Sequence, residues 1–389
     1  MKVCFFAHNS SSHQNGATLS LENIVNELVK RGIEVIIIFP NKSVKIFKES
    51  DRLKCFFVSS FSMRVPIHKK GFISNLKGRL KCTINWFSMR KTLSILKKEK
   101  PDLIHINGLD SGIGAKIASK LEVPYIWHIR QFLEEDFGLR LYNQKRVYDL
   151  LNKADSIIAI SNSIKEKFEK ELDRDLELIY NGIPIEKYHI KTNNRFANKQ
   201  IGILLAGRIN KNKGQLDAVK AVGHLVEKGF KNIYLILAGD AQDIKYLRKI
   251  QEFIIKHNLN EFIRIIDYVE ELKQLRTECD IGLVCSKKEA FGRVTIETML
   301  SNMLVIGANS GGTAELIDDD ITGLLYQEGD YISLANKIEY AIANKEEMKT
   351  IIRSGYKTVV ENYSVNRVVD QILDLYKEVL RTRLDKEVK

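Results

Sequence analysis

Two glutamates eight residues apart, Glu289 and Glu297, lie on either side of a predicted helix start near Gly292. The apolar run 281–284 before them predicts a buried strand. The first amides of a helix point outward unpaired, and the helix dipole favours negative charge there. Carboxylates beside such an anion site would repel phosphate, but they suit hydroxyl groups. The pattern therefore predicts a pocket for a molecule with both phosphate and hydroxyls, such as a sugar nucleotide.

The spacing also sets the distances within this pocket. Glu297 would lie roughly 7 Å along the helix axis at ~1.5 Å per residue, whereas Glu289 stays in the preceding loop. The amides of Phe291, Gly292 and Arg293 fall between the two carboxylates. One acid can then meet a sugar and the other a ribose, with the phosphate between them.

A second strand-like run, 201–205, is followed by Arg208 and Lys213 at the turn into a predicted helix. An arginine fork and a lysine point charge at that position could neutralise a diphosphate, although solvated surface cations are the alternative. Downstream, residues 311–315 (Gly-Gly-Thr-Ala-Glu) repeat the pattern of a glycine loop and a helix start. In a parallel sheet this loop would lie beside the loop that carries Glu289, unless it is a plain glycine turn.

The first half of the chain offers weaker candidates. A polar loop, residues 8–15, leads into Gly16 and a helix, where backbone could approach a phosphate closely; an ordinary turn glycine is the alternative. His128, with Arg130, lies at the C-terminal end of a predicted strand, on the ligand side of the sheet, and is interpreted as a substrate contact. His105 is interpreted as a packing residue.

The elements that position these residues are alternating strands and amphipathic helices, which indicate parallel sheets built from right-handed βαβ units. The alternation of strands and helices begins again after a linker near residues 180–195. We expect an α/β protein with two doubly wound, Rossmann-like domains facing across a cleft. The predicted domains are 1–190, joined by a C-terminal helix over 364–382 that packs back onto it, and 198–363.

Composition narrows the function classes. The whole net charge of +12 falls within residues 1–195, and 51–100 hold 13 Lys and Arg against two acids. Cations interleaved with apolar residues over 64–100 favour an anionic membrane surface over an amphipathic helix with a solvated face. Nucleic acid is disfavoured because no recognition motif accompanies the charge. No apolar run has the ~20 residues of a membrane helix.

Five scattered cysteines indicate buried thiols in a reducing cytosol. No cluster has metal-ligand spacing, and the acids 318–320 read as a solvated turn, so we expect no metal and no cofactor besides the donor. The expected location is cytoplasmic, peripheral on the inner face of the plasma membrane.

These residues together resemble the retaining glycosyltransferases of family 4, which have the GT-B fold. The resemblance is strongest over 201–326 and extends across nearly the whole chain. The block 286–297 is similar to the family's Glu-x7-Glu signature, and 311–315 to its glycine-glycine motif. Residues 207–208, 213–214 and 181–183 also look like family motifs.

The resemblance implies roles for individual residues. Arg208 and Lys213 would bind the donor diphosphate, Glu289 would face the transferred sugar, Glu297 would hold the ribose, and His128 would contact the sugar near the reacting centre.

The turn that contains Tyr268 and Val269 lies where family members meet the base. Many members carry two glycines in the first loop, whereas this chain has Asn15 and Gly16, which makes contact of that loop with the leaving phosphate less secure.

The implied activity is retaining, metal-independent transfer of a hexosyl or N-acetylhexosaminyl unit from a nucleotide sugar, with a UDP-sugar favoured over a GDP-sugar. The acceptor would be a lipid-linked glycan in bacterial-type surface polysaccharide or glycolipid synthesis. Two alternatives stay open: a catalytically inactive glycosyltransferase-like subunit that binds a nucleotide sugar, and a GT-B sugar-nucleotide epimerase.

Overall fold

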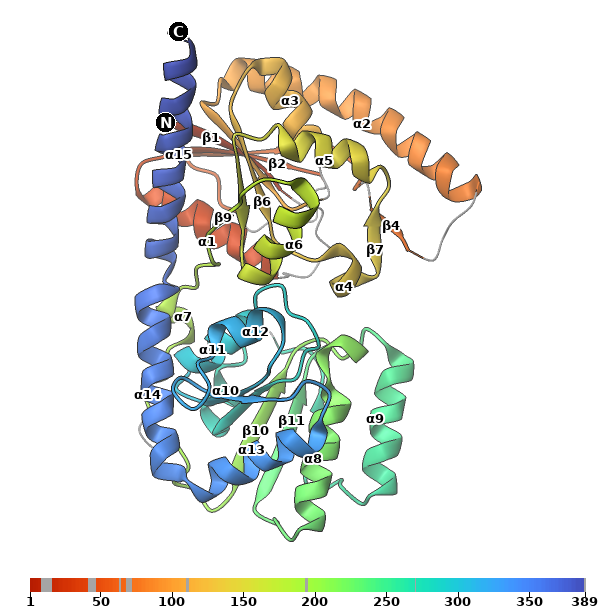
Figure 1. Ribbon diagram of the computed structural model, residues 1–389, viewed down its shortest axis with the longest axis vertical. Helices are drawn as coiled ribbons and strands as arrows, with labels where there is room; N and C mark the ends of the chain where they lie inside the picture. Colours follow the sequence, from red (N-terminus) through yellow and green to blue (C-terminus); the bar gives the residue numbers. More distant parts are fainter. Residues whose placement is uncertain are drawn as a thin grey trace. The chain divides into compact units, whose positions relative to one another are not determined.

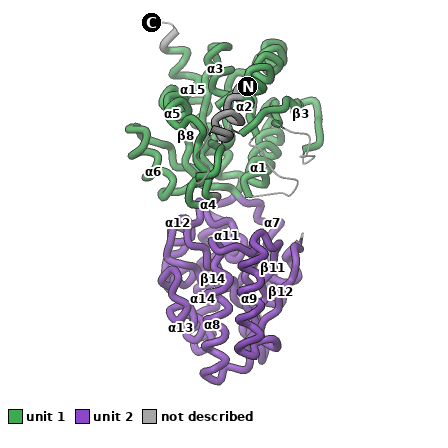
Figure 2. The backbone as a smooth tube through the Cα atoms, turned by 90° about the vertical axis from the view of Figure 1, so that its right-hand side faces the viewer, with its two compact units in different colours: residues 1–182, 365–389 green, residues 183–364 purple. Residues whose placement is uncertain are grey.

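The computed structural model describes residues 1–7, 16–40, 47–62, 64–67, 72–109, 112–192, 195–269 and 271–387. The chain divides into two compact units, coloured separately in Figure 2: unit 1 holds residues 1–182 and 365–389, and unit 2 holds 183–364. The sequence placed the end of the first domain at residue 190. Residues 183–190 lie in unit 2 because their backbone is tied there; the carbonyl of Tyr188, for example, accepts a hydrogen bond from Ser301 Oγ at 3.1 Å.

Unit 1 is built on a parallel seven-stranded sheet (Figure 1). Its strands run in the order β3 (Leu53–Phe57), β2 (Glu34–Phe39), β1 (Lys2–Phe6), β5 (Leu103–Asn107), β6 (Tyr125–Ile129), β8 (Ser156–Ala159), β9 (Glu177–Leu178). A separate antiparallel pair joins β4 (Arg64–Pro66) and β7 (Leu139–Leu141). The strand order reverses between β1 and β5, which is where doubly wound sheets bind ligands.

Helices connect the strands of unit 1: α1 (Gly16–Lys30), α2 (Phe72–Glu99), α3 (Ile113–Leu121), α4 (Leu133–Phe137), α5 (Gln144–Asn152), α6 (Asn162–Leu172) and the C-terminal α15 (Val365–Glu387). Helix α15 lies against α1, where Arg31 pairs with Asp370 and donates to the carbonyl of Asn366 at 2.9 Å. It also buries Ile372 and Tyr376 in the core that covers one face of the sheet. The end of the chain is thus an integral layer of unit 1.

Unit 2 repeats the architecture with a six-stranded parallel sheet, in the order β12 (Ile263–Ile266), β11 (Ile233–Ala238), β10 (Ile201–Ala206), β13 (Ile281–Val284), β14 (Leu304–Ala308), β15 (Leu324–Tyr326). Its helices are α7 (Ile185–Tyr188), α8 (Gln215–Glu227), α9 (Ile244–Lys256), α10 (Lys273–Glu278), α11 (Arg293–Leu300), α12 (Gly311–Leu316), α13 (Tyr331–Ala343) and α14 (Lys345–Asn362). Both predicted parallel-sheet domains are therefore confirmed.

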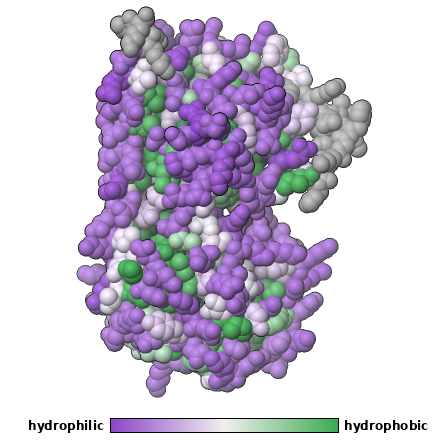
Figure 3. Space-filling model, viewed as in Figure 1, coloured by the Kyte–Doolittle hydropathy of each residue, from purple (hydrophilic) through white to green (hydrophobic). Residues whose placement is uncertain are grey.

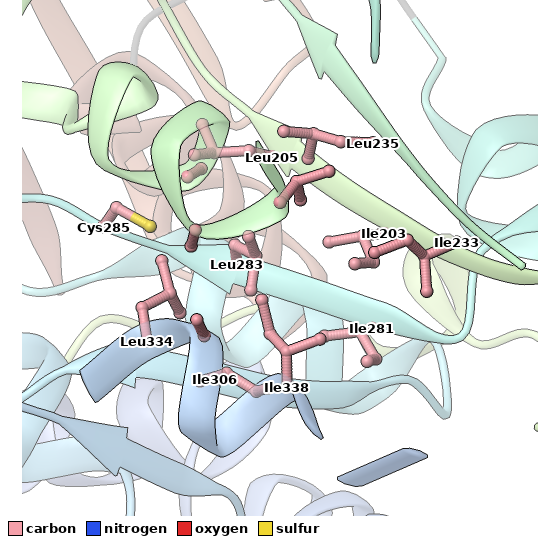
Figure 4. Close-up of a cluster of buried hydrophobic side chains, with 14 of the residues drawn as sticks. Ile203, Leu205, Ile233, Leu235, Ile281, Leu283, Cys285, Ile306, Leu334 and Ile338 are labelled. Carbon is pink, nitrogen blue, oxygen red and sulfur yellow. The ribbon is translucent and has the colours of Figure 1, made fainter. Parts of the chain in front are cut away.

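Residues of β10 alternate between two cores, as the period of a strand requires. Ile203 and Leu205 face the larger core, which also holds Ile281 and Leu283 of β13 and Ile338 of α13 (Figure 4). Leu204 and Ala206 face the opposite core with residues of β11. A sheet buried on both faces explains why its strands read as continuous apolar runs.

One glycine brings two loops of unit 2 together. Gly214, between the 3-10 turn η1 (Lys211–Lys213) and α8, has a φ of 67°. A Cβ atom there would overlap the carbonyl oxygen of Cys285, and the amide of Lys287 donates to the carbonyl of Asn212 at 3.0 Å. The turn after β10 therefore lies directly on the loop after β13.

We predict that Gly214→Ala lowers the free energy of unfolding by about 3 kcal/mol, because it combines a left-handed backbone with a clash against backbone. Gly229→Ala is the matched control, since Gly229 has a φ of 98° and no atom lies within 4 Å of the added Cβ. That variant should cost only about 1 kcal/mol. Thermal unfolding measures both, and equal losses would show that the approach of the two loops is not close.

Candidate functional site

The candidate site of unit 2 lies at the carboxyl ends of β10 and β13, which are neighbours in the sheet. The strand order reverses between these two strands, and doubly wound sheets bind ligands at such a point. Arg208 follows β10, Lys213 ends the 3-10 turn, and Glu289 lies in the loop after β13. The structure thus brings together three residues that the sequence assigned to one pocket.

The carboxylate of Glu289 is held by two neighbours. Lys213 Nζ forms an ion pair with Glu289 Oε1, and Ser286 Oγ donates to the same oxygen at 2.6 Å. Burial raises the pKa of Glu289, but Lys213, Ser286 and the charge of Arg208 outweigh burial and hold that pKa below its ordinary value. Glu289 is therefore ionised at neutral pH, and its second oxygen remains available to accept hydrogen bonds from a ligand.

Arg208 is the exposed residue among Arg208, Lys213 and Glu289. Its carbonyl accepts a hydrogen bond from Gln215 Nε2 at 3.0 Å, which fixes the backbone at the strand end. Within the part of the chain that the structure describes, its guanidinium forms no hydrogen bond or salt bridge. A guanidinium in this position has five donors to offer an anion.

Helix α11 begins where the sequence predicted. Gly292 is its N-cap, with a φ of 90°, and Arg293 is its first residue. A Cβ atom on Gly292 would lie 3.3 Å from the hydroxyl of Thr295 and 3.4 Å from that of Thr313. Both hydroxyls are buried and have no hydrogen-bond partner among the described residues. The start of α11 thus adds two unused hydroxyls to the amides of Phe291, Gly292 and Arg293.

The glycine pair after β14 has a packing role. The amide of Gly312 donates to the carbonyl of Glu289 at 2.8 Å, and a Cβ on Gly312 would lie 2.5 Å from the carbonyl oxygen of Phe291. Gly311 approaches the backbone of Glu289 in the same way. The two loops therefore lie side by side, as the sequence indicated, and the glycines allow the backbones to touch.

Glu297 is clamped between two arginines. Arg276 Nη2 lies 2.6 Å from one carboxylate oxygen, and Arg293 Nη2 lies 3.2 Å from the other. Tyr188 supports both arginines: its hydroxyl accepts from Arg293 at 3.2 Å and its ring lies 5.3 Å from the guanidinium of Arg276. Burial raises the pKa of Glu297, but the two arginines outweigh it and lower the pKa. The carboxylate keeps lone pairs free to accept from hydroxyls.

Tyr268, Val269 and Gly16 are the remaining residues that the sequence assigned to donor binding. Tyr268 and Val269 follow the edge strand β12 and are 51% and 37% exposed, so their side chains are accessible to a base. Gly16 is the first residue of α1, while the polar loop 8–15 before it lies outside the described residues.

Unit 1 holds a second polar cluster, on β5 and β6. The register pairs Asn107 with His128, so His105 and Asn107 share a face of the sheet with His128 and Arg130. His105 Nε2 lies 3.1 Å from His128 Nδ1, and Tyr376 of α15 places its hydroxyl 2.6 Å from His105 Nδ1. His105, interpreted from the sequence as a packing residue, is thus the link between His128 and α15.

Arg130 holds the other end of this cluster. It donates to the side-chain oxygens of Asn107 and Asn181, and its Nη2 lies 3.2 Å from His128 Nδ1. Burial, followed by the charge of Arg130, lowers the pKa of His128 and of His105 well below the ordinary range. Both imidazoles are therefore neutral. The Nε2 atom of His128 is buried and has no partner among the described residues.

Several of these residues escaped the sequence analysis. Arg276 lies in the short polar helix α10, where nothing distinguishes it from surface charge. Thr295 and Thr313 carried no signal beyond their position near helix starts. Tyr376 meets the histidine cluster from a distant part of the sequence. Asn181 lies in the 181–183 motif, but its hydrogen bond with Arg130 carried no signal in the sequence.

None of the described helices is long and apolar enough to cross a membrane. No group of three or more His, Cys, Asp or Glu side chains in the described ranges is placed to hold a metal ion.

Two family models match consecutive parts of the chain. "Glycosyltransferase Family 4" matches residues 14–187, and "Glycosyl transferases group 1" matches residues 186–358. The border between the two matches falls within a few residues of the boundary between units 1 and 2. Each unit thus corresponds to one of the two glycosyltransferase models.

Whole-chain comparisons agree with these matches. The capsular polysaccharide biosynthesis glycosyltransferase CapM of Staphylococcus aureus is 26% identical, over 76% of this chain and 81% of its own. A Campylobacter jejuni enzyme, GalNAc-alpha-(1->4)-GalNAc-alpha-(1->3)-diNAcBac-PP-undecaprenol alpha-1,4-N-acetyl-D-galactosaminyltransferase, is 25% identical over 97% of this chain and 99% of its own.

Among solved structures, HepE of Anabaena in complex with UDP and glucose has a TM-score of 0.76 and 21% identity, and the match covers 97% of this chain and 99% of HepE. The expected GT-B fold is confirmed by this similarity. The family models and the relatives support a glycosyltransferase as the class of protein.

The Glu297 clamp yields a prediction about stability. Arg276→Met should lower the free energy of unfolding at pH 7 by about 3 kcal/mol, because it leaves a buried carboxylate with one partner. The folded-state pKa of Glu297 is lowered, so its contribution is present above the unfolded pKa of about 4.3 and is lost as pH falls through the folded pKa. The difference between variant and wild type should therefore shrink below about pH 4.

Thermal unfolding between pH 3 and pH 8 measures this difference. Lys349→Met is the control, since the pair of Lys349 with Glu346 is solvent-exposed and should contribute little. A constant penalty for Arg276→Met across this range would contradict an electrostatic role for Arg276.

Proposed function

We propose that the protein is a retaining, metal-independent glycosyltransferase that moves a hexosyl or N-acetylhexosaminyl unit from a nucleotide sugar to a lipid-linked glycan. The observation that carries the proposal is the convergence of Arg208, Lys213 and Glu289 at the switch point of unit 2. Two cations and one carboxylate at that position match a donor with a diphosphate and a hydroxyl-rich sugar. The resemblance to family 4 assigns the same residues to the same donor.

In the proposed reaction, the bond between the anomeric carbon and the diphosphate oxygen breaks, and a bond to the acceptor oxygen forms on the same face of the sugar. The proton of the acceptor hydroxyl goes to the departing phosphate, so the products are a glycosylated acceptor and a nucleoside diphosphate. Negative charge grows on the diphosphate, where Arg208, Lys213 and the amides at the start of α11 stabilise it. Positive charge grows on the sugar, near Glu289.

The relatives guide the choice of substrates. HepE was solved with UDP, which favours a UDP-sugar over a GDP-sugar as the donor. The name of the Campylobacter jejuni relative gives a glycan on diphosphoundecaprenol as its acceptor, and CapM is named for capsular polysaccharide synthesis. We therefore assign this chain a lipid-linked acceptor in surface polysaccharide or glycolipid synthesis, and a location on the inner face of the plasma membrane.

Helix α2 supplies the proposed membrane contact. Its buried side carries Asn85, Ser88 and Thr92, which are bonded to nearby backbone, and the apolar Leu96. Its outer side carries Trp86 and Phe87, which are 45% and 60% exposed. The two rings lie 4.9 Å apart, edge to face.

Cations accompany this aromatic pair. The guanidinium of Arg90 lies 4.2 Å from the ring of Trp86, and Lys91 is exposed beside it. The face in Figure 3 is mostly hydrophilic, with hydrophobic residues in small patches, so binding would combine a few aromatic anchors with charge. Part of the basic stretch, residues 68–71, lies outside the described residues.

The donor site predicts the effect of two substitutions. Glu289→Gln and Lys213→Ala should each lower kcat about 100-fold, since each removes a charge that stabilises the transition state. Release of UDP from a panel of UDP-sugars, with a bacterial lipid extract as acceptor, measures the rate. Lys228→Ala is the matched control, because Lys228 forms an exposed lysine–glutamate pair with Glu339 in the same unit. Wild-type rates in both site variants would end the assignment.

The same assay separates the alternatives. Incubation of the wild-type protein with donor alone, followed by analysis of the sugar, would reveal a new epimer if the protein is an epimerase. Binding of UDP-sugar without any turnover, with or without acceptor, would indicate an inactive subunit. Both outcomes contradict the proposed transfer.

The membrane contact predicts a loss of vesicle binding. Arg90→Gln combined with Lys91→Gln should weaken binding to phosphatidylglycerol vesicles by about 2 kcal/mol, or about 30-fold, at ~1 kcal/mol per cation. Flotation at rising salt measures it. Arg248→Gln with Lys249→Gln is the matched control, an exposed Arg–Lys pair on α9 of unit 2. Absence of wild-type binding at low salt would remove the membrane from the proposal.

A further inference from the structure

The histidine cluster of unit 1 forms a continuous chain of side-chain contacts from helix α15 to the carboxyl end of β6. Tyr376, His105 and His128 follow one another at 2.6 Å and 3.1 Å, and Arg130 closes the chain at 3.2 Å from His128. His105 and His128 are fully buried, and Phe5 stacks on the ring of His105 at 4.6 Å between centroids. Both rings are therefore fixed in place, and the positions of their protons decide which nitrogen atoms donate and which accept.

The Arg130 end of this row of contacts favours one position of the His128 proton. A guanidinium has only donors, so the contact of Arg130 Nη2 with His128 Nδ1 is a hydrogen bond only if Nδ1 is the acceptor. A proton on Nδ1 would face the guanidinium hydrogens. The neutral imidazole of His128 therefore carries its proton on Nε2. The same assignment makes His105 Nε2 the donor to His128 Nδ1 at 3.1 Å.

The contact between Tyr376 and His105 gives the same order of protons by a separate argument. If His105 has its proton on Nε2, its Nδ1 is an acceptor, and the hydroxyl of Tyr376 donates to it at 2.6 Å. In the reverse order the hydroxyl would be the acceptor, and its own proton would have no partner among the described residues. Tyr376 is fully buried, and such an unpaired donor would be costly.

We infer that Tyr376 and His105 are positioning residues that hold His128 as a neutral Nε2–H donor for an oxygen atom of a substrate bound to unit 1. The unpartnered Nε2 atom of His128 is the end of the chain and is buried, so its proton is free for a ligand. The identity of the ligand rests on the proposed function. The order of protons does not, because it follows from the contacts alone.

This arrangement gives His128 a defined role in the chemistry. A neutral donor can bind a substrate oxygen without placing a second buried cation beside Arg130, which an imidazolium would do. The low pKa values of His128 and His105, caused first by burial and then by Arg130, agree with a neutral donor.

The proton order is measured directly by NMR of the full chain labelled with ¹⁵N-histidine. His128→Asn identifies the signals of His128 among the 8 histidines by their disappearance. We expect a protonated, pyrrole-type Nε2 and an unprotonated Nδ1 for His128 in the wild-type protein. A proton on Nδ1 of His128 would overturn the inference without any variant.

Tyr376→Phe tests the positioning role, since it deletes one hydroxyl. His105 then loses the donor at its Nδ1, and the His128 nitrogen signals should move toward those of a tautomer mixture. The kcat should fall about tenfold, with KM for the donor nearly unchanged. Tyr125→Phe is the matched control. The Tyr125 hydroxyl donates to the carbonyl of Leu150 at 2.6 Å in the same unit and takes no part in the contacts among Tyr376, His105, His128 and Arg130.

The two readouts separate the inference from the proposed function. Unchanged His128 signals and unchanged kcat in Tyr376→Phe would overturn the inference, as would equal effects of Tyr125→Phe. If the wild-type protein transfers no sugar, the proposed function fails, and the part of the inference that names a substrate fails with it. The NMR spectra still decide the proton order in that case.

Discussion

The close approach of two backbones at Gly214 and Cys285 is the constraint on which the candidate site of unit 2 depends. Parallel strands β10 and β13 are fixed by the sheet, but the loops after them could diverge. A residue without a side chain, in a left-handed conformation, lets the turn after β10 rest on the loop after β13. Only then does Lys213 reach Glu289. The chemistry of the site is thus set by main-chain packing before any charge is considered.

Charge is handled differently in the two units. In unit 2 each carboxylate of the site is compensated by cations, so both acids stay ionised although burial opposes it. In unit 1 the two histidines lose their charge, because a buried Arg130 is close and desolvation disfavours a second cation. One unit therefore presents fixed charges, and the other presents a neutral donor.

The sequence predicted what is local along the chain. The end of β13, the start of α11 at Gly292 and the loop position of Glu289 follow from periodicity and a glycine, which act over a few residues. The partners of these residues could not be predicted in the same way. Arg276 lies 21 residues from Glu297, and Tyr376 lies 271 residues from His105. Such contacts are products of tertiary packing, and no short-range pattern encodes them.

The balance of charges in unit 2 connects its two acids to the proposed donor. Arg208 and Lys213 with Glu289 leave one net positive charge, and Arg276 and Arg293 with Glu297 leave another. A diphosphate carries one negative charge on each phosphate, so it would neutralise the whole group. Without the glutamates, four cations would bind phosphate more tightly but would also hold the nucleoside diphosphate after transfer. In the proposed function, the acids would therefore favour a ligand that has hydroxyls as well as phosphates, and they would limit the affinity for the product.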